Sequence, residues 1–293
     1  MPLLSIPSPP GGELDVGPIA IHAYGLMLLL AIVAATVLTG IRWTRRGGDW
    51  DLVFQVAVWG VAFGIIGARA YHVLTSWNEV PDEWWGVFAV WEGGLGVWGG
   101  IFLGTLAGAV VVRRSGNSVF AFMDAAAPGL LLAQAVGRWG NWFNQELFGE
   151  PTDRPWGLEI DLEHRPLGYL DVETFHPVFL YEFGWNLLGV IVLLVLDRFV
   201  RFRPPALFAL YVAWYTAFRA YEETLRIDQA HELFGQRLNF WVSVALFAVS
   251  FLFFVWWQFF RRRRGGGERA EPRRPRPVQP KEQMAVPRGR VRG

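Results

Sequence analysis

The chain has 293 residues, of which 53% are hydrophobic, and its formal net charge at pH 7 is +1. With 16 tryptophans, this composition is typical of a polytopic membrane protein and excludes an ordinary soluble domain. The sequence contains no cysteine, which excludes disulfide bonds, thiolate metal sites and a covalent thioester route. Lysine occurs once, at Lys281, so arginine carries nearly all of the positive charge, and its planar guanidinium suits phosphate.

Seven apolar segments have roughly the length of about 20 residues that a membrane-spanning helix needs. The first segment does not resemble a cleaved signal peptide, because its N-terminal flank is rich in proline and has no basic residue. The sixth is short and ends in polar residues, which makes its limits the hardest to place. We therefore predict an all-α polytopic membrane protein with seven transmembrane helices, near residues 19–41, 52–75, 95–112, 120–136, 178–196, 206–221 and 240–260.

Charge alternates between the connections. Arginines follow the first, third, fifth and seventh segments, whereas the connections between them are acidic or mixed. Basic residues concentrate on the cytoplasmic side of membrane proteins, so we expect the N-terminus outside and the C-terminus in the cytoplasm. The arginines are Arg42, Arg45, Arg46, Arg113, Arg114, Arg198, Arg201, Arg203 and Arg261 to Arg264.

This orientation divides the chain into five parts. Residues 1–18 form an extracytoplasmic N-terminal segment, and residues 19–143 hold the first four helices. Residues 144–175 are expected to form a small extracytoplasmic cap, with short strands around residues 156–160, and residues 176–260 hold the last three helices. Residues 261–293 are rich in Gly, Pro and Arg, which predicts a disordered, basic cytoplasmic tail attracted to anionic lipid.

Nearly every polar cluster in or beside a span falls in its outer half, with Asp124 as the main exception. Ionisable residues inside a membrane cost about 2.5–3.5 kcal/mol at a helix centre, so each is a candidate functional residue. The candidates are Tyr24, Arg69, Arg138, Asn141, Glu146, His176, Arg219, Glu223 and Arg226.

Helical spacing brings some of these residues together. Arg219, Glu223 and Arg226 stand at i, i+4 and i+7 and share one helix face, so the carboxylate can pair with either guanidinium. Arg138 and Asn141 also share a face. Such a set could present several guanidinium groups to one phosphate, with carboxylates orienting them. No histidine and carboxylate spacing suggests a metal site, and we expect no cofactor.

Five motifs, in this order, resemble those of the bacterial prolipoprotein diacylglyceryl transferase family. They cover the chain from about His22 to Arg226. The motifs are Tyr24-Gly25-Leu26, Gly67-Ala68-Arg69, Gly137-Arg138-x-Gly140-Asn141-x-x-Asn144-x-Glu146-x-x-Gly149, His176-Pro177-x-x-Leu180-Tyr181-Glu182 and Arg219-x-x-x-Glu223-x-x-Arg226.

The resemblance implies seven spans in the bacterial cytoplasmic membrane, with the N-terminus outside. It also implies the first step of lipoprotein maturation. An sn-1,2-diacylglyceryl group would move from phosphatidylglycerol to the lipobox cysteine thiol of a prolipoprotein signal peptide, forming a thioether and releasing glycerol phosphate. Partners would be these two substrates and membrane lipids. Nucleic acid is not expected, because no aromatic residues are interleaved with the C-terminal arginines.

By the same resemblance, Arg138 and Arg219 would bind the phosphate, and Glu223 would hold Arg219. Asn141 and Glu146 would shape the site, and Tyr24 would line the headgroup pocket. Two further arginines complete the expected phosphatidylglycerol site, Arg69 and Arg226. Alternatively, Arg69 extends to the interface or pairs with an acidic neighbour such as Glu79.

The third-span motif departs from the family pattern. Many members have a histidine where this chain has Trp98, in Gly96-Val97-Trp98-Gly99-Gly100. A free thiol has a pKa of about 8.5, so it needs either a base or a cationic environment. The available bases are His176, Glu146 and Glu223, and the alternative is that arginines alone lower the thiol pKa.

Three rival functions fit parts of the sequence. A transporter needs polar groups across both leaflets, which this chain lacks, and it shows no inverted repeat. A phosphatase or glycerophosphotransferase usually needs a metal site or a histidine nucleophile. A non-catalytic lipid-binding scaffold would tolerate Arg138→Lys better than an enzyme that relies on bidentate geometry.

Overall fold

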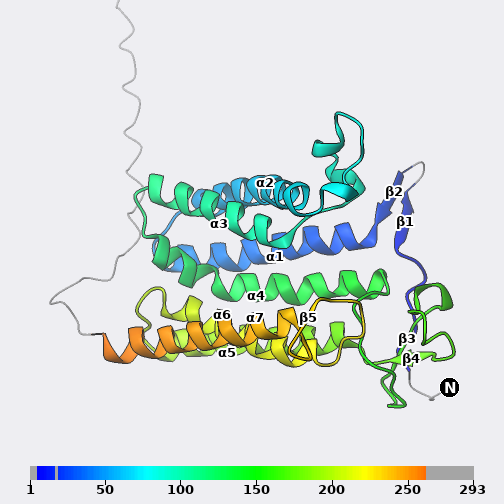
Figure 1. The fold of residues 1–293 in the computed structure, drawn as a ribbon. Coiled ribbons are helices and arrows are strands. Elements are labelled where there is room, and N and C mark those ends of the chain that lie inside the picture. Colours follow the sequence, from blue (N-terminus) through cyan, green and yellow to red (C-terminus); the bar gives the residue numbers. More distant parts are fainter. Residues whose placement is uncertain (1–4, 17–18, 262–293) are drawn as a thin grey trace, which may run out of the picture.

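The computed structural model describes residues 5–16 and 19–261. In this part of the chain, seven α-helices run side by side in an elongated bundle (Figure 1). They are α1 (Ala23–Arg45), α2 (Trp50–Thr75), α3 (Val97–Arg114), α4 (Val119–Phe143), α5 (Val178–Phe199), α6 (Ala206–Glu223) and α7 (Leu238–Val255), which ends in a π-helical turn at Trp256–Phe260.

In the described part of the chain, six of these helices are long and apolar enough to cross a membrane. The exception is α6, whose last turns carry Arg219, Glu222 and Glu223. Helices therefore dominate the fold as predicted, and the coarse prediction of a helical membrane protein is confirmed. Residues 19–22 form a strand before α1 in place of the predicted start of a helix, and α4 runs beyond the predicted apolar segment to Phe143.

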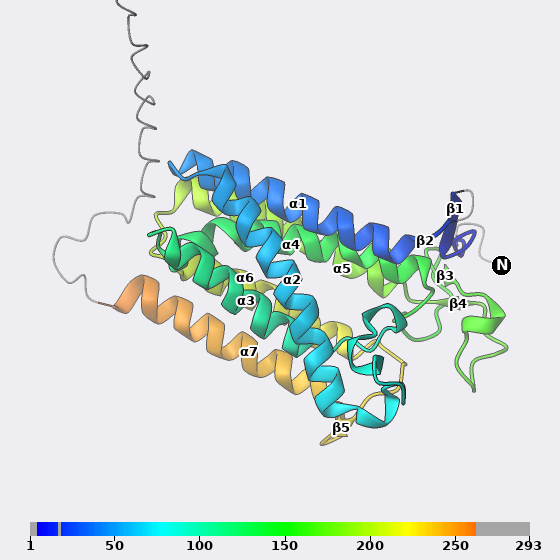
Figure 2. The ribbon, with the colours of Figure 1, turned by 90° about the horizontal axis from the view of Figure 1, so that it is seen from above.

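The helices pack largely in neighbouring pairs. α1 lies along α4, α2 along α3 and α6 along α7, while α4 also packs against α5 and α6 (Figure 2). Half of the most apolar stretch of α4 is buried, a larger share than in the other candidate spans. Because α4 lies in the interior, it can carry functional side chains away from lipid.

Small residues allow a very close helix contact between α2 and α3. A Cβ atom added to Gly67 would lie 2.3 Å from the carbonyl oxygen of Gly99, and one on Gly99 would lie 2.1 Å from that of Gly67. Glycine at both positions lets the two backbones touch, as is common between membrane helices. The Gly67-Ala68-Arg69 motif thus has a packing role.

The strands all lie at one end of the bundle, which we call the cap end (Figure 1). β1 (Glu13–Val16) pairs with β2 (Ile19–His22), β3 (Leu158–Glu159) with β4 (Thr174–Phe175), and β5 (Glu232–Leu233) with β6 (Gln236–Arg237), all antiparallel. β3 lies within the predicted strand region at residues 156–160. We refer to residues 144–175 as the cap.

The cap has its own apolar core. Phe148, Leu158, Ile160 and Phe175 are buried together with Phe179 at the start of α5. The N-terminal segment joins this core, because Ile6 bridges Leu158 in parallel and the indole of Trp142 donates to the carbonyl of Pro7. The cap is therefore fixed to the ends of α4 and α5.

A polar cluster lies at the opposite end of the bundle, which we call the arginine-rich end. Arg42 is buried and donates to the backbone carbonyl of Asp124 and to the carboxylate of Asp197, 3.2 Å away. Arg46 contacts both oxygens of Asp197, and Asp124 accepts a bond from the backbone N–H of Phe208. The predicted tail beyond Arg261 lies outside the described residues.

Candidate functional site

Two buried glutamates and two partly exposed arginines form a cluster at the cap end. Arg138 Nη2 lies 2.6 Å from Glu182 Oε2, and Arg219 Nη1 lies 2.8 Å from Glu222 Oε2. Each arginine also approaches the other carboxylate at 3.8 Å. Because Arg138 comes from α4, Glu182 from α5, and the other two from α6, the cluster joins three helices by charge.

Glu223 extends this cluster into the connection between α6 and α7. It pairs with Arg219 and Arg226, which are its neighbours in sequence, and accepts a hydrogen bond of 2.6 Å from Arg237 Nε. Arg226 and Arg237 both contact Asp228, at 2.7 and 2.8 Å. We call these eight residues, from Arg138 to Arg237, the arginine–carboxylate network.

Asp228 lies outside the helices and has a lowered pKa. Partial burial raises the pKa of this carboxyl, but hydrogen bonds and charges from Arg226 and Arg237 outweigh it. Asp228 is therefore ionised at neutral pH. With Glu182, Glu222 and Glu223 it gives four carboxylates against four guanidinium groups, so the network as described is close to neutral when all are charged.

Asn141 and Glu146 connect to the network through Arg138. Arg138 Nη1 donates to Asn141 Oδ1 at 3.2 Å, and Asn141 Nδ2 donates to Glu146 Oε1 at 2.8 Å. The ring of Tyr24 packs against Gly140, where a Cβ atom would come within 2.7 Å of it. The structure thus brings Tyr24, Asn141 and Glu146 beside Arg138, as expected from the sequence.

Gly149 brings its own motif into contact with the motifs that contain His176 and Arg226. Its N–H donates to the carbonyl of His176, and it forms an antiparallel bridge with Arg226. A Cβ atom here would lie 2.9 Å from the Cβ of His176 and 3.0 Å from the carbonyl of Leu225. Glycine is required for this close approach, which holds the end of α4, the start of α5 and the end of α6 together.

His176 lies beside the network but outside its chain of side-chain contacts. Its Nδ1 lies 3.0 Å from the hydroxyl of Tyr181, which accepts a hydrogen bond from the indole of Trp156. Burial, helped by the charge of Arg154, lowers the pKa of His176. The imidazole is therefore neutral at pH 7 and able to accept a proton.

Arg69 is not part of the network. Its guanidinium donates to the backbone carbonyls of Gly86, Val87, Gly93 and Gly94 in the α2–α3 connection. These bonds use all three guanidinium nitrogens of a buried side chain to fix a loop, and each of them goes to a backbone carbonyl. Trp98, at the position of the family histidine, lies in the first turn of α3 and is 47% exposed.

Sequence reasoning missed four members of the network, which are Glu182, Glu222, Asp228 and Arg237. Glu182 was noticed as part of a motif, without a role. Glu222 stands three residues after Arg219, a spacing that could have identified it. Arg237 gave no local signal, because the β5–β6 hairpin folds it back onto Glu223.

This arrangement can offer two oriented guanidinium groups to an anion. Arg138 and Arg219 keep 15% and 16% of their side-chain surface exposed, while the carboxylates between them are sealed. Guanidinium groups held by second partners are oriented before a ligand arrives. Within residues 5–16 and 19–261, no group of three His, Asp or Glu side chains is placed to hold a metal ion.

Comparison with known proteins agrees with the sequence motifs. Residues 13–256 match the family model described as prolipoprotein diacylglyceryl transferase. The chain is 49% identical over 255 residues to phosphatidylglycerol–prolipoprotein diacylglyceryl transferase 2 of Streptomyces coelicolor, covering 84% of this chain and 79% of that one. It is 48% identical over 247 residues to the corresponding protein of Cutibacterium acnes, covering 83% of each chain. For that of Bifidobacterium adolescentis, identity is 43% over 270 residues, covering 87% and 80%.

Proposed function

The chain belongs to the prolipoprotein diacylglyceryl transferase family, and we propose that Arg138 and Arg219 bind the phosphate of its lipid substrate in that reaction. It is a transferase that moves a diacylglyceryl group from phosphatidylglycerol to a prolipoprotein. The acceptor in this proposal is the lipobox cysteine of the signal peptide.

One observation carries the assignment of the site. Two arginines from different helices, α4 and α6, meet over shared buried carboxylates and remain partly exposed. Several groups maintain this geometry, so the guanidinium groups need little rearrangement when phosphate charge develops. Preorganised donors of this kind are commonly the largest contribution to catalysis.

The proposed step is a substitution at carbon. The substrate thiol gives its proton to a base, and its sulfur attacks carbon 3 of the glyceryl group. The bond between that carbon and the phosphate oxygen breaks, and its electron pair leaves on glycerol phosphate. Arg138 and Arg219 stabilise the charge that grows on this leaving group.

Among the candidate bases, the contacts favour Glu146. Glu223 is held by Arg219, Arg226 and Arg237, and these contacts occupy both of its carboxylate oxygens. Glu146 accepts hydrogen bonds from Asn141 and Asn144, and makes no ion pair with any described residue. His176, neutral and near the cap, is the alternative base.

The proposed orientation follows from the two ends of the bundle. The arginine-rich end would face the cytoplasm, which places the N-terminus, the cap and the arginine–carboxylate network on the outer side of the bacterial cytoplasmic membrane. α6 would also cross the membrane, which brings the number of spans to seven. Its polar last turns would be accommodated there because α6 packs against α4, α5 and α7.

Cysteine-accessibility labelling in intact cells tests this orientation, because the chain has no cysteine of its own. Leu167→Cys places a thiol at an exposed position of the cap, and Arg45→Cys places one at the exposed opposite end. A membrane-impermeant maleimide should label Leu167→Cys in intact cells and Arg45→Cys only after the cells are broken. The reverse pattern would invert the proposed orientation.

The first test of the site is a transfer assay in proteoliposomes. It uses phosphatidylglycerol with labelled acyl chains and a lipobox peptide, and compares wild type with Arg138→Ala, Arg219→Ala and Glu146→Gln. Arg45→Ala is the matched control, because this arginine is exposed at the opposite end of the bundle. Label should reach the peptide cysteine in wild type and the control, and transfer that survives in Arg138→Ala would rule out the proposed phosphate site.

A further inference from the structure

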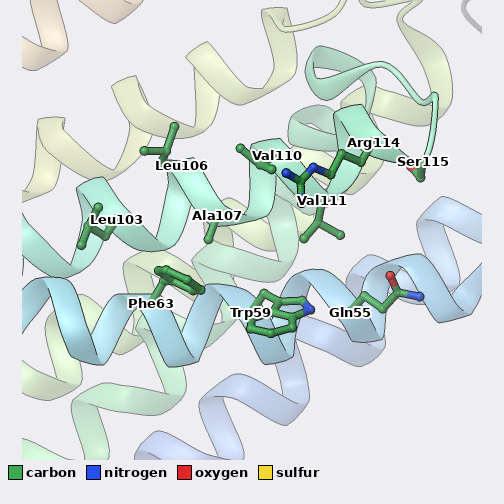
Figure 3. Close-up of a pocket in the computed structure, with 10 residues that line it drawn as sticks. All are labelled: Gln55, Trp59, Phe63, Leu103, Leu106, Ala107, Val110, Val111, Arg114 and Ser115. Carbon is green, nitrogen blue, oxygen red and sulfur yellow. The ribbon is translucent and has the colours of Figure 1, made fainter.

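A concave site lies far from the arginine–carboxylate network. It is a groove of about 700 Å³ between the first half of α2 and the second half of α3, at the arginine-rich end. Figure 3 shows Trp59 and Phe63 on one wall and Leu106 and Val110 on the other. Its volume is in the usual range of small-molecule sites, about 300–1,000 Å³.

The length of the groove corresponds to one leaflet. Its α3 wall runs from Leu103 to Ser115, which at about 1.5 Å per residue is about 18 Å. Half of a bilayer core of about 30 Å is about 15 Å. A single acyl chain that enters from the arginine-rich end would therefore lie along the groove without reaching the other leaflet.

The polar groups of the groove are gathered at one end. Gln55, Arg114 and Ser115 stand at its mouth, and the rest of its lining is apolar. Arg114 lies back along α3 toward Val110 and Val111 in Figure 3, and it makes no hydrogen bond or ion pair with any residue in the described part of the chain. Its guanidinium is thus available at the head of an apolar channel.

We propose that this groove binds one anionic phospholipid of the cytoplasmic leaflet, with an acyl chain between α2 and α3 and its phosphate on Arg114. The charge argues against the other apolar occupant, a signal peptide, because the cytoplasmic end of such a peptide is itself positive. Arg113 and Arg114 would repel it. The assignment to the cytoplasmic leaflet depends on the proposed orientation, but the binding chemistry does not.

The test measures lipid binding to the full-length protein by native mass spectrometry after detergent exchange. The probe is phosphatidylserine, an anionic lipid that is not the proposed substrate, with phosphatidylcholine as the uncharged comparison. We expect wild type to retain one phosphatidylserine in preference to phosphatidylcholine. Arg114→Gln should weaken this binding about tenfold, as for loss of a charged hydrogen bond.

Matched variants separate the groove from other surfaces. Arg113→Gln removes the neighbouring charge outside the groove lining and should leave phosphatidylserine binding unchanged, as should Arg138→Ala at the network. Ala107→Trp, which fills the groove, should weaken binding of phosphatidylserine while Arg114 remains. Diacylglyceryl transfer, measured separately, should be unchanged in Arg114→Gln, so failure of this proposal is distinct from failure of the active-site assignment.

Three results would overturn the proposal. Equal retention of phosphatidylserine and phosphatidylcholine would make the groove a surface for ordinary boundary lipid. Equal losses in Arg113→Gln and Arg114→Gln would show a diffuse charge effect. Displacement of phosphatidylserine by a signal peptide, in wild type but not in Ala107→Trp, would assign the groove to the peptide.

Discussion

Arginines meet carboxylates at both ends of this bundle, but the two clusters are built differently. At the arginine-rich end, Arg42 and Arg46 share the single carboxylate of Asp197, and Arg42 also holds a backbone carbonyl. At the cap end, Arg138 and Arg219 each face both Glu182 and Glu222.

The two clusters differ in whether their arginines can contact a ligand. The contacts of Arg42 connect α1 to α4 and α5, and its side chain is only 6% exposed. Arg138 and Arg219 are also fixed, yet they keep some accessible surface beside Asn141 and Tyr24. A buried ion pair is therefore weak evidence of function by itself. Two carboxylates shared by two partly exposed arginines distinguish the site from the structural cluster, where two arginines share one carboxylate and only Arg46 is accessible.

The largest effect is expected for Arg138. Arg138→Ala should lower the rate of diacylglyceryl transfer on the order of 10²–10³-fold, because it removes an oriented donor to the leaving phosphate. Arg138→Lys should recover little, since a lysine cannot reproduce the planar fork. Initial rates in proteoliposomes, with thermal unfolding as a folding check, measure this. Full activity in Arg138→Lys would show that charge alone is sufficient.

Arg42→Ala should produce the opposite pattern. The change leaves a buried polar site at the junction of α1, α4 and α5, and should cost about 3 kcal/mol of stability. Thermal unfolding in detergent should show the loss, while the rate per folded molecule stays near that of wild type. If activity falls but unfolding does not change, the division into a structural and a functional end would be wrong.

Glu223→Gln and Asp197→Asn each replace a carboxylate by an amide, one in the arginine–carboxylate network and one at the arginine-rich end. Glu223 orders three guanidinium groups, so its amide variant should lower transfer about tenfold through poorer orientation of Arg219. Asp197→Asn should leave the transfer rate unchanged and lower only thermal stability. Measured rates that are equal in the two variants would contradict a specific role for Glu223.

Arg69→Lys examines a third kind of buried arginine, which neither cluster contains. A lysine has three donors and cannot bond the four carbonyls that Arg69 reaches, so the α2–α3 connection should loosen by about 1–3 kcal/mol. Limited proteolysis should then cut residues 77–95 faster than in wild type. Unchanged cleavage together with lost phosphatidylglycerol binding would restore Arg69 to the substrate site.

The smallest effect is expected from His176. Its pKa is lowered on folding, first by burial, so the neutral form is favoured in the folded protein. This contribution to stability is fully present above the unfolded pKa of about 6.5 and is lost as the pH falls through the folded value. His176→Gln should therefore flatten the decline of thermal stability below about pH 6.5. A decline identical to that of wild type would show that another group titrates.

Much of the site was visible in the sequence because it depends on spacing within single helices. Arg219 and Glu223 had to share a face of α6, and Asn141 had to lie beside Arg138 on α4. The roles of Arg69 and Arg237 were not visible. Arg69 reaches loop carbonyls, which have no sequence signature, and Arg237 arrives through a short hairpin.

The sequence by itself thus determined the helical membrane class, the family and most residues of the proposed phosphate site, since hydrophobic length and i, i+3 or i+4 spacing are local properties. The tertiary structure decided which carboxylate meets which guanidinium. That choice depends on how α4, α5 and α6 are rotated against one another, and on close backbone contacts such as Gly149 with His176. These are non-local properties, because they are fixed by packing between segments far apart in the chain.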